Sequence, residues 1–222
     1  MDRSNADLTS MHWVHRPPQA STLDIVCLGW SAPASAIQRV NEDHAVVAIS
    51  NPVNDLWLNT LITDAKDYDN CRITAWSLGV VTASRLLGDI SNAQFEAING
   101  VPFPFEGCLD RTTTVAMANA LTPDALHAFQ MGMCGSRRAL QRWRALDGHP
   151  DLIRLQQSLA WWIAIEREPP MVRASRWSSA CVSSHDRICD PQGQIAQWQR
   201  LGLAEPTIVT GAHWLPDALL VP

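Results

Sequence analysis

The chain of 222 residues has almost no lysine, because Lys66 is the only one, so nearly all of its positive charge is arginine. It has no low-complexity run, and 46% of its residues are hydrophobic, as expected of a globular protein. The net charge of -5 gives no overall reason to expect nucleic-acid binding. The length suits one well-buried domain with room for an insertion.

None of the six cysteines stands in a C-x-x-C pair, which removes the usual signal for a zinc knuckle or a thioredoxin-type motif. Three of them, Cys27, Cys71 and Cys181, lie in apolar runs, where a free cysteine behaves as a small core residue. The N-terminus lacks the apolar region of a signal peptide, and no run approaches the ~20 apolar residues of a membrane span. We therefore expect a cytoplasmic protein, not bound to a membrane, with reduced thiols.

Apolar runs of strand length alternate with helical patterns in the first half of the chain. Continuous rather than alternating apolar runs are typical of parallel strands covered on both faces. We expect such strands at residues 23–29, 44–50, 71–76 and 95–100, with helices at 33–40, around Leu56 to Leu61, and after Gly79. This alternation predicts a mostly parallel α/β sheet flanked by helices.

The alternation stops at residue 105. Residues 105–172 show helical periodicity only, with helices expected from Pro123, at 137–144 and at 150–165. Strand character returns at 179–183 and 207–210, with a helix at 194–201 between them. We interpret 1–21 as an N-terminal arm with a short edge strand near Trp13, 22–104 and 173–222 as the α/β core, and 105–172 as a helical lid over the active-site end of the sheet.

A serine stands at the junction between the third strand and the helix after it. Ser77 has a small residue two positions before it, Ala75, and Gly79 two positions after it, which is the pattern of a nucleophile elbow. The flanking residues are small because strand and helix approach closely behind a strained serine. The pattern taken alone also fits a strand–helix junction that carries a serine by chance.

An acid and a histidine follow Ser77 in the order that such a serine needs. Asp186 comes directly after the penultimate strand and His213 directly after the last. A serine nucleophile requires a base to take its proton and a carboxylate to orient that base. Asp190 and Asp110 are competing acids, and the adjacent His185 is expected to point elsewhere.

Stabilisation of a tetrahedral oxyanion requires two main-chain N–H groups aimed at the carbonyl oxygen. One is expected from Leu78, the residue after the nucleophile, and the other from Trp30, in the loop after the first buried strand. The remaining histidines show no metal-ligand spacing, so we expect no metal site.

These residues resemble those of the BioG-type pimeloyl-[acyl-carrier protein] methyl ester esterases, which belong to the α/β-hydrolase superfamily. The resemblance extends over most of the chain from residue 23. Two of its segments are absent from general hydrolases: Asn99-Gly100 within residues 97–102, and Met133-Cys134-Gly135-Ser136. The other matching segments are Leu28-Gly29-Trp30, residues 74–80, Phe129, residues 184–188 and residues 211–214.

The resemblance implies an α/β-hydrolase fold with a helical lid, and hydrolysis of the methyl ester of pimeloyl-[acyl-carrier protein] in biotin synthesis. It implies acyl transfer through Ser77, without cofactor, in a cytoplasmic enzyme that we expect to be a monomer. The substrate contacts expected are Trp30, Trp76, Phe129 and Trp214.

An acidic carrier protein is expected to dock on positive charge near the lid. The lid sequence offers a cluster of arginines, namely Arg137, Arg138, Arg142, Arg144 and Arg154. A solvated helix face in an arginine-rich protein explains the cluster equally well. The alternative functions are a general short-acyl carboxylesterase or thioesterase, and a non-catalytic binding protein with the same fold.

Overall fold

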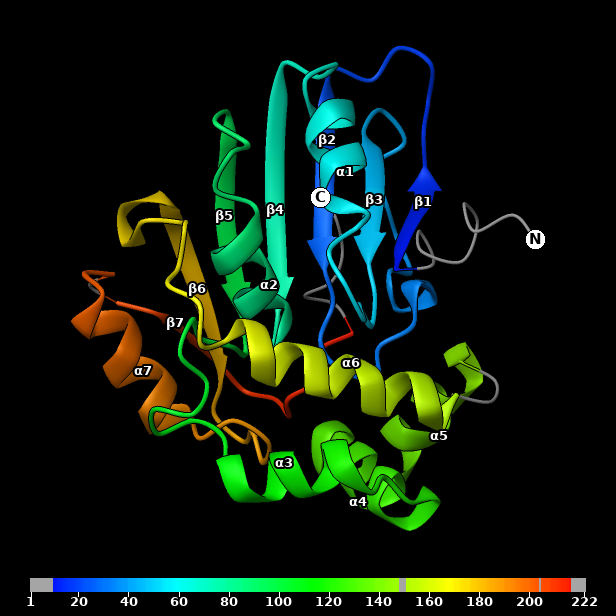
Figure 1. Ribbon diagram of the computed structural model, residues 1–222, viewed down its shortest axis with the longest axis vertical. Helices are drawn as coiled ribbons and strands as arrows, with labels where there is room; N and C mark the ends of the chain where they lie inside the picture. The colour runs from blue at the N-terminus through cyan, green and yellow to red at the C-terminus, as the bar shows by residue number, and fades with distance from the viewer. Residues whose placement is uncertain (1–9, 148–150, 204, 217–222) are drawn as a thin grey trace.

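The computed structural model describes residues 10–147, 151–203 and 205–216. Its centre is a sheet in the order β1-β3-β2-β4-β5-β6-β7 (Figure 1). The strands are β1 (Met11–His15), β2 (Thr22–Cys27), β3 (Ala45–Ile49), β4 (Asn70–Trp76), β5 (Ala93–Ile98), β6 (Trp177–Ser183) and β7 (Thr207–Val209). Only β1 pairs antiparallel to its neighbour, so the carboxyl ends of the other strands meet at one edge. The edge strand expected near Trp13 is this β1.

Two hydrophobic clusters cover the two faces of the sheet. Successive residues of β2 alternate between them, with Ile25 in one cluster and Val26 in the other. Because both faces are covered, β2 and β3 read as continuous apolar runs. The helices of the core are α1 (Leu58–Ala65), α2 (Gly79–Leu86) and α7 (Pro191–Arg200), with a 3₁₀ turn η2 (Ala174–Arg176) before β6.

Four helices lie within residues 105–172, at the carboxyl ends of the strands, and we use the word lid below as a label for these four helices. They are α3 (Arg111–Asn119), α4 (Pro123–Cys134), α5 (Arg137–Asp147) and α6 (Leu152–Ile165), and α6 crosses directly below the arrowheads of the strands in Figure 1. The sequence predicted three helices here and missed α3. The side chain of Asp110 caps this helix by accepting a hydrogen bond from the Thr113 N–H.

The predicted helix at residues 33–40 is wrong. Only a 3₁₀ turn, η1 (Ala34–Ala36), forms there, and Ile37 already has the extended backbone of φ -81° and ψ 97°. Ala36 and Ile37 are buried in the same cluster as Trp143 of α5. Packing against the lid therefore overrides the local helical pattern. No helix within the described residues combines the length and apolar character needed to cross a membrane.

Candidate active site

Ser77 lies between the end of β4 and the start of α2. Its φ of +57° is in the left-handed region, which a residue other than glycine rarely adopts. A Cβ atom on Gly79 would lie 2.0 Å from the main-chain oxygen of Cys27, so only glycine allows α2 to approach β2 this closely. The turn holds Ser77 at the carboxyl edge of the sheet, where it lines a cavity shared with α3, α4 and α6.

A chain of two hydrogen bonds joins Ser77 to His213 and Asp186. His213 Nε2 lies 2.8 Å from Ser77 Oγ, and His213 Nδ1 lies 2.7 Å from Asp186 Oδ2. His213 and Asp186 are both buried, whereas Ser77 is partly accessible. A proton on Nδ1, bonded to the carboxylate, leaves Nε2 free to accept the Ser77 proton.

The Asp186 carboxylate is held by four donors. Oδ1 accepts hydrogen bonds from the N–H groups of Ile188 (2.8 Å) and Cys189 (2.9 Å). Oδ2 accepts one from Nε2 of Gln194 (3.1 Å) in addition to that of His213. A carboxylate bonded in this way is fixed in orientation.

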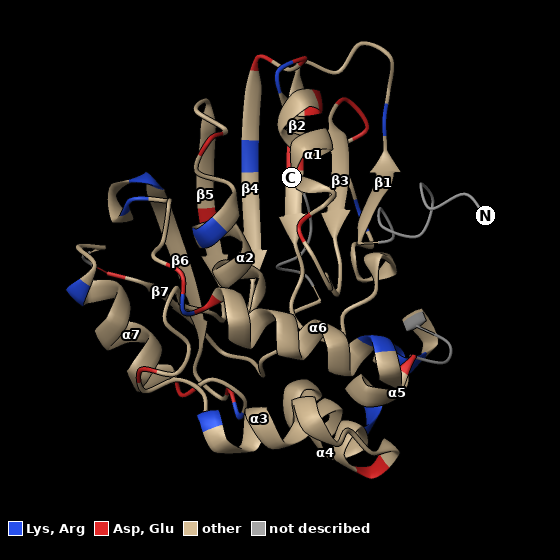
Figure 2. Cartoon of the chain, in the orientation of Figure 1, with Lys and Arg blue, Asp and Glu red and all other residues tan. Residues whose placement is uncertain are grey.

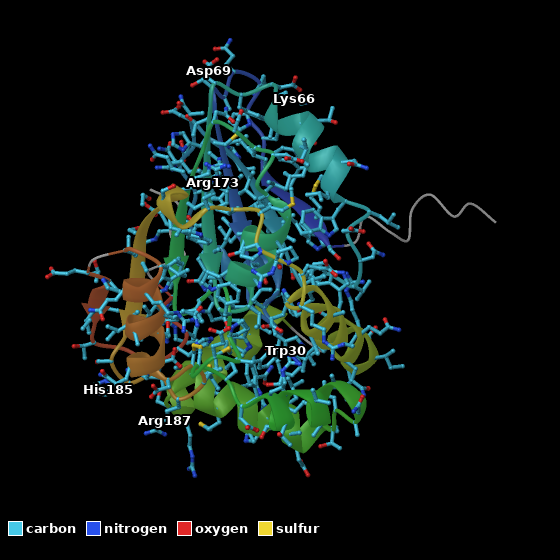
Figure 3. The ribbon with its side chains drawn as sticks, turned by 60° about the vertical axis from the view of Figure 1, so that its left-hand side comes forward. Trp30, Lys66, Asp69, Arg173, His185 and Arg187 are labelled. Atoms are coloured by element: carbon cyan, nitrogen blue, oxygen red, sulfur yellow. A yellow bond between two sulfur atoms is a disulfide. The ribbon has the colours of Figure 1, made fainter. Side chains whose placement is uncertain are left out.

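The two competing acids serve elsewhere as helix caps. Asp190 caps α7 through the Gly193 N–H, and Asp110 caps α3 through the Thr113 N–H. The hydrogen bonds from Thr113 hold the pKa of Asp110 below its usual value. His185 is exposed and extends outward from the loop that carries Asp186 (Figure 3).

Two main-chain N–H groups beside Ser77 are free. Within the described part of the chain, neither Trp30 N–H nor Leu78 N–H donates a hydrogen bond to a protein acceptor. Leu78 stands at the start of α2, where the first N–H groups of a helix lack partners. The indole of Trp30 donates to Leu155 O of α6 (2.8 Å), which fixes this ring against the helices of residues 105–172 (Figure 3).

An apolar cavity of about 220 Å³ opens above Ser77. Its walls come from the loop after β2, the turn between β4 and α2, the helices α3, α4 and α6, and the loop after β6. The lining residues are Trp30, Ser77, Leu78, Leu109, Asp110, Thr113, Thr114, Met117, Phe129, Leu159, Arg187 and Ile188. Trp30 and Phe129 pack edge to face with ring centroids 4.7 Å apart. The cavity suits an apolar chain that ends at the serine. No group of three or more His, Cys, Asp or Glu among the described residues is arranged to bind a metal ion.

The family model described as "Pimeloyl-ACP methyl esterase BioG" matches residues 11–217. The chain belongs to the BioG family. It is therefore an esterase that acts on the methyl ester of pimeloyl-[acyl-carrier protein], and the prediction of this function in biotin synthesis is confirmed. The carrier protein is accordingly its substrate partner.

One solved structure and two curated relatives are similar to this chain. The crystal structure of BioG from Haemophilus influenzae superposes with a TM-score of 0.77 at 22% identity, over 94% of this chain and 95% of that one. The α/β-hydrolase fold is thus confirmed. A protein of Haemophilus influenzae named only as uncharacterized is 26% identical over 202 residues, 89% of this chain and 90% of its own length. A malonyl-[acyl-carrier protein] O-methyltransferase of Bacteroides fragilis is 30% identical over 155 residues, 66% of this chain but only 30% of its own length.

Two of the four predicted substrate contacts of this BioG chain lie outside the cavity. Trp30 and Phe129 line it, whereas Trp76 and Trp214 are buried and are not among its lining residues. Both of these rings pack on Trp143 of α5, with centroids 5.9 and 5.2 Å away. Contact of these two rings with substrate stays a prediction. Their shared partner Trp143 lies on α5, and sequence position alone does not show this.

The arginines of the predicted cluster lie on two helices, four on α5 and Arg154 on α6. Arg137, Arg138, Arg142 and Arg144 are exposed on α5, and Figure 2 shows this charge at the outer end of the lid. Arg154 does not extend the cluster. Its guanidinium donates to Ser10 Oγ (3.0 Å) and Asn51 O (3.3 Å), so it ties α6 to the core.

The expectation of six reduced cysteines is wrong. Cys108 and Cys189 form a disulfide, with Cα atoms 4.6 Å apart. The two residues are 81 positions apart and follow different strands, so their spacing carries no signal. The remaining four cysteines are free.

The structure adds polar groups that sequence reasoning missed. Gln194 is fully buried beside Asp186, and Arg187 lies at the edge of the cavity. Gln194 and Gln197 share the buried face of α7 with Trp198. A polar residue on the apolar face of a predicted helix is a usable signal, because a buried amide needs a partner.

Proposed function

We propose that Ser77, His213 and Asp186 are the nucleophile, base and orienting acid that hydrolyse the methyl ester. The observation that carries the proposal is the hydrogen-bonded chain from Ser77 Oγ through the buried His213 to the buried Asp186. Its Ser77 end lines an apolar cavity. In acyl transfer a serine needs these partners at this spacing.

Acylation begins when His213 Nε2 takes the proton of Ser77 Oγ as the oxygen attacks the ester carbonyl. The negative charge that develops on the carbonyl oxygen is stabilised by the free N–H groups of Trp30 and Leu78. His213 then gives its proton to the leaving methoxy oxygen, and methanol departs. Asp186 stabilises the imidazolium during both transfers through the 2.7 Å bond to Nδ1.

Deacylation repeats the steps with water as the nucleophile. His213 takes a proton from water, the hydroxyl oxygen attacks the acyl-enzyme, and Ser77 leaves with the proton returned by His213. The product carries a free carboxylate in place of the methyl ester. An anion is poorly retained by an apolar cavity, which favours its release.

The pimeloyl chain occupies the apolar cavity in this proposal. Met117 of α3, Phe129 of α4 and Leu159 of α6 supply apolar surface from the lid, opposite Trp30. The methyl ester lies at the end of the pimeloyl chain farthest from the thioester. The carrier protein must therefore bind on the outside of the lid, while only the acyl chain enters.

The exposed face of α5 is the docking surface that fits an acidic carrier protein. Arg138 and Arg142 are four positions apart and thus lie on one helical face. The Arg142 guanidinium stands 5.9 Å from the ring of Trp214, and Arg144 NH2 lies 2.6 Å from His127 Nδ1 of α4. Charges on this surface speed and orient association with an oppositely charged partner.

Substitution of the nucleophile tests the proposal. We expect Ser77→Ala to lose both hydrolysis of methyl pimeloyl-carrier protein and labelling by a fluorophosphonate, while the Tm is retained. In a biotin auxotroph that lacks its demethylating esterase, the wild-type protein should restore growth without biotin and Ser77→Ala should not. Full activity of Ser77→Ala disproves the assigned nucleophile.

Comparison of two substrates separates this esterase from a general one. We expect kcat/KM for the carrier-bound methyl ester to exceed that for p-nitrophenyl acyl esters of similar length, because docking adds binding energy. Equal values favour a general carboxylesterase.

A further inference from the structure

Two segments that the sequence analysis singled out, Asn99-Gly100 and Met133 to Ser136, take no part in the chemistry proposed above. In the structure both segments meet the loop that carries His213. The main-chain oxygen of His213 accepts from the Asn99 side chain, and Met133 O accepts from the Trp214 N–H. The loop of the base is thus held from two sides.

Asn99 lies directly after β5 and is 1% exposed. Its φ of +47° is in the left-handed region, where asparagine is commoner than other residues apart from glycine. Its Oδ1 accepts from Ser183 N–H (2.7 Å), and its Nδ2 donates to Ser183 Oγ (2.8 Å) and to His213 O (2.8 Å). Every polar atom of this buried amide is therefore used.

A second donor reaches the same oxygen. The indole Nε1 of Trp76 lies 3.0 Å from His213 O. Trp76 precedes Ser77 in the chain and pairs with Ile98, the residue before Asn99, in the β4–β5 ladder. Because both donors are fixed by the sheet next to the nucleophile, they fix the main chain of His213 relative to Ser77.

The lid holds the residues on either side of His213. Trp214 N–H donates to Met133 O (2.9 Å) in the last turn of α4. Gly135 ends that helix with a φ of +71°, and a Cβ atom there would lie 2.8 Å from the Cβ of Ala212. Only glycine allows the end of α4 to approach the loop so closely.

We propose that Asn99 is a positioning residue for His213, acting through the main-chain carbonyl and supported by Trp76 and the end of α4. The inference rests on the proposed role of His213 as the base. The Nε2–Oγ contact of 2.8 Å depends on where this main chain stands. A displacement of the base by a fraction of an ångström slows proton transfer without changing the cavity that binds the substrate.

The decisive experiment compares Asn99→Asp with Ser183→Ala. Asn99→Asp keeps the size of the side chain but replaces the donor by an oxygen that repels His213 O. Ser183→Ala removes the other acceptor of the same amide and leaves the bond to His213 intact. For a short methyl ester we expect Asn99→Asp to lower kcat about 10- to 100-fold with KM within about twofold of wild type. We expect Ser183→Ala to lower the Tm but to keep kcat within about twofold.

Further variants separate a positioning role of Asn99 from a purely structural role. If Asn99→Asp does not fold, Asn99→Gly keeps the positive φ and removes the donor, and it should lower kcat with little change in KM. Trp76→Phe should lower kcat in the same direction, because it removes the second donor. An equal loss of kcat in Ser183→Ala overturns the inference, since Asn99 then only ties β5 to β6. Unchanged kcat in Asn99→Asp overturns it too. Full activity of His213→Gln refutes instead the proposed function.

Discussion

The disulfide between Cys108 and Cys189 joins the segment that enters the lid to the loop that holds Asp186. Cys189 donates its N–H to Asp186 Oδ1 (2.9 Å), and Cys108 O accepts from Asp190 N–H (3.1 Å). Leu109, the next residue after Cys108, lines the cavity. The bond therefore connects the wall of the proposed acyl site with the carboxylate of the proposed triad.

Loss of this disulfide is expected to affect the free energy of unfolding more than kcat. It closes a long loop, and removal of such a cross-link costs on the order of 2–4 kcal/mol. We expect Cys108→Ser/Cys189→Ser to lower the free energy of unfolding by about that amount. Urea unfolding of oxidised and reduced wild type and of the variant is the measurement. Reduced wild type should match the variant, and addition of reductant should not change the variant.

Labelling of the cysteine thiols tests whether Cys108 and Cys189 are joined by a disulfide. Burial raises the pKa of Cys27 and Cys134 to about 12, so both stay protonated and unreactive near neutral pH. We expect maleimide to label these two slowly in the native protein. Under denaturing conditions without reductant, mass spectrometry should find Cys108 and Cys189 unlabelled. Their labelling before reduction contradicts the disulfide.

Asp186 rather than Asp190 is expected to be the acid that orients His213. Asp186→Asn keeps the shape but favours the wrong imidazole tautomer, which in a serine triad costs about 10⁴-fold in kcat. Asp190→Asn is the matched control, because asparagine also caps a helix. Steady-state kinetics on a short methyl ester are the measurement. Comparable losses in the two variants exclude the assignment.

Charge reversal on α5 is expected to affect only the carrier-bound substrate. We predict that Arg138→Glu/Arg142→Glu raises KM for methyl pimeloyl-carrier protein about tenfold or more and leaves KM for a short free ester unchanged. The effect should shrink as salt is added, because exposed charges are screened. An equal rise in KM for the carrier-bound and the free ester would exclude a docking role for Arg138 and Arg142.

The arginine that faces inward gives a contrasting control. Arg154→Ala removes the bonds to Ser10 and Asn51 and should lower the Tm. Its KM for the carrier-bound ester should stay that of wild type. A specific rise in that KM instead extends the docking surface to α6.

A larger residue at Met117 is expected to shorten the acyl chain that the enzyme accepts. Met117 lines the cavity from α3, so phenylalanine there reduces a volume of about 220 Å³. We predict that Met117→Phe lowers kcat/KM about tenfold or more for the methyl pimeloyl group and less for shorter methyl esters, because overpacking costs about 1–3 kcal/mol. Met171→Phe is the control, since Met171 is 51% exposed. A uniform loss across chain lengths places the acyl chain elsewhere.

Local sequence patterns were sufficient to predict the strands of the sheet and the order in which the candidate site residues follow them. The runs that became β2 and β3 are largely apolar because both faces of the sheet are covered, and this pattern is visible in the local sequence. Ser77, Asp186 and His213 each follow a strand, and parallel strands bring their carboxyl ends to one edge. Strand order and chain direction thus imply that these side chains are neighbours.

What the sequence determined is therefore where the chain forms strands and which residues stand at their ends. The tertiary structure decided which direction each side chain faces and what it meets. Trp30 enters the cavity while Trp76 turns to His213 O, and Cys108 meets Cys189 across 81 residues. The physical reason is that strand and helix patterns come from neighbours in the chain. Buried hydrogen bonds, ring contacts and cross-links form between segments that only packing brings together.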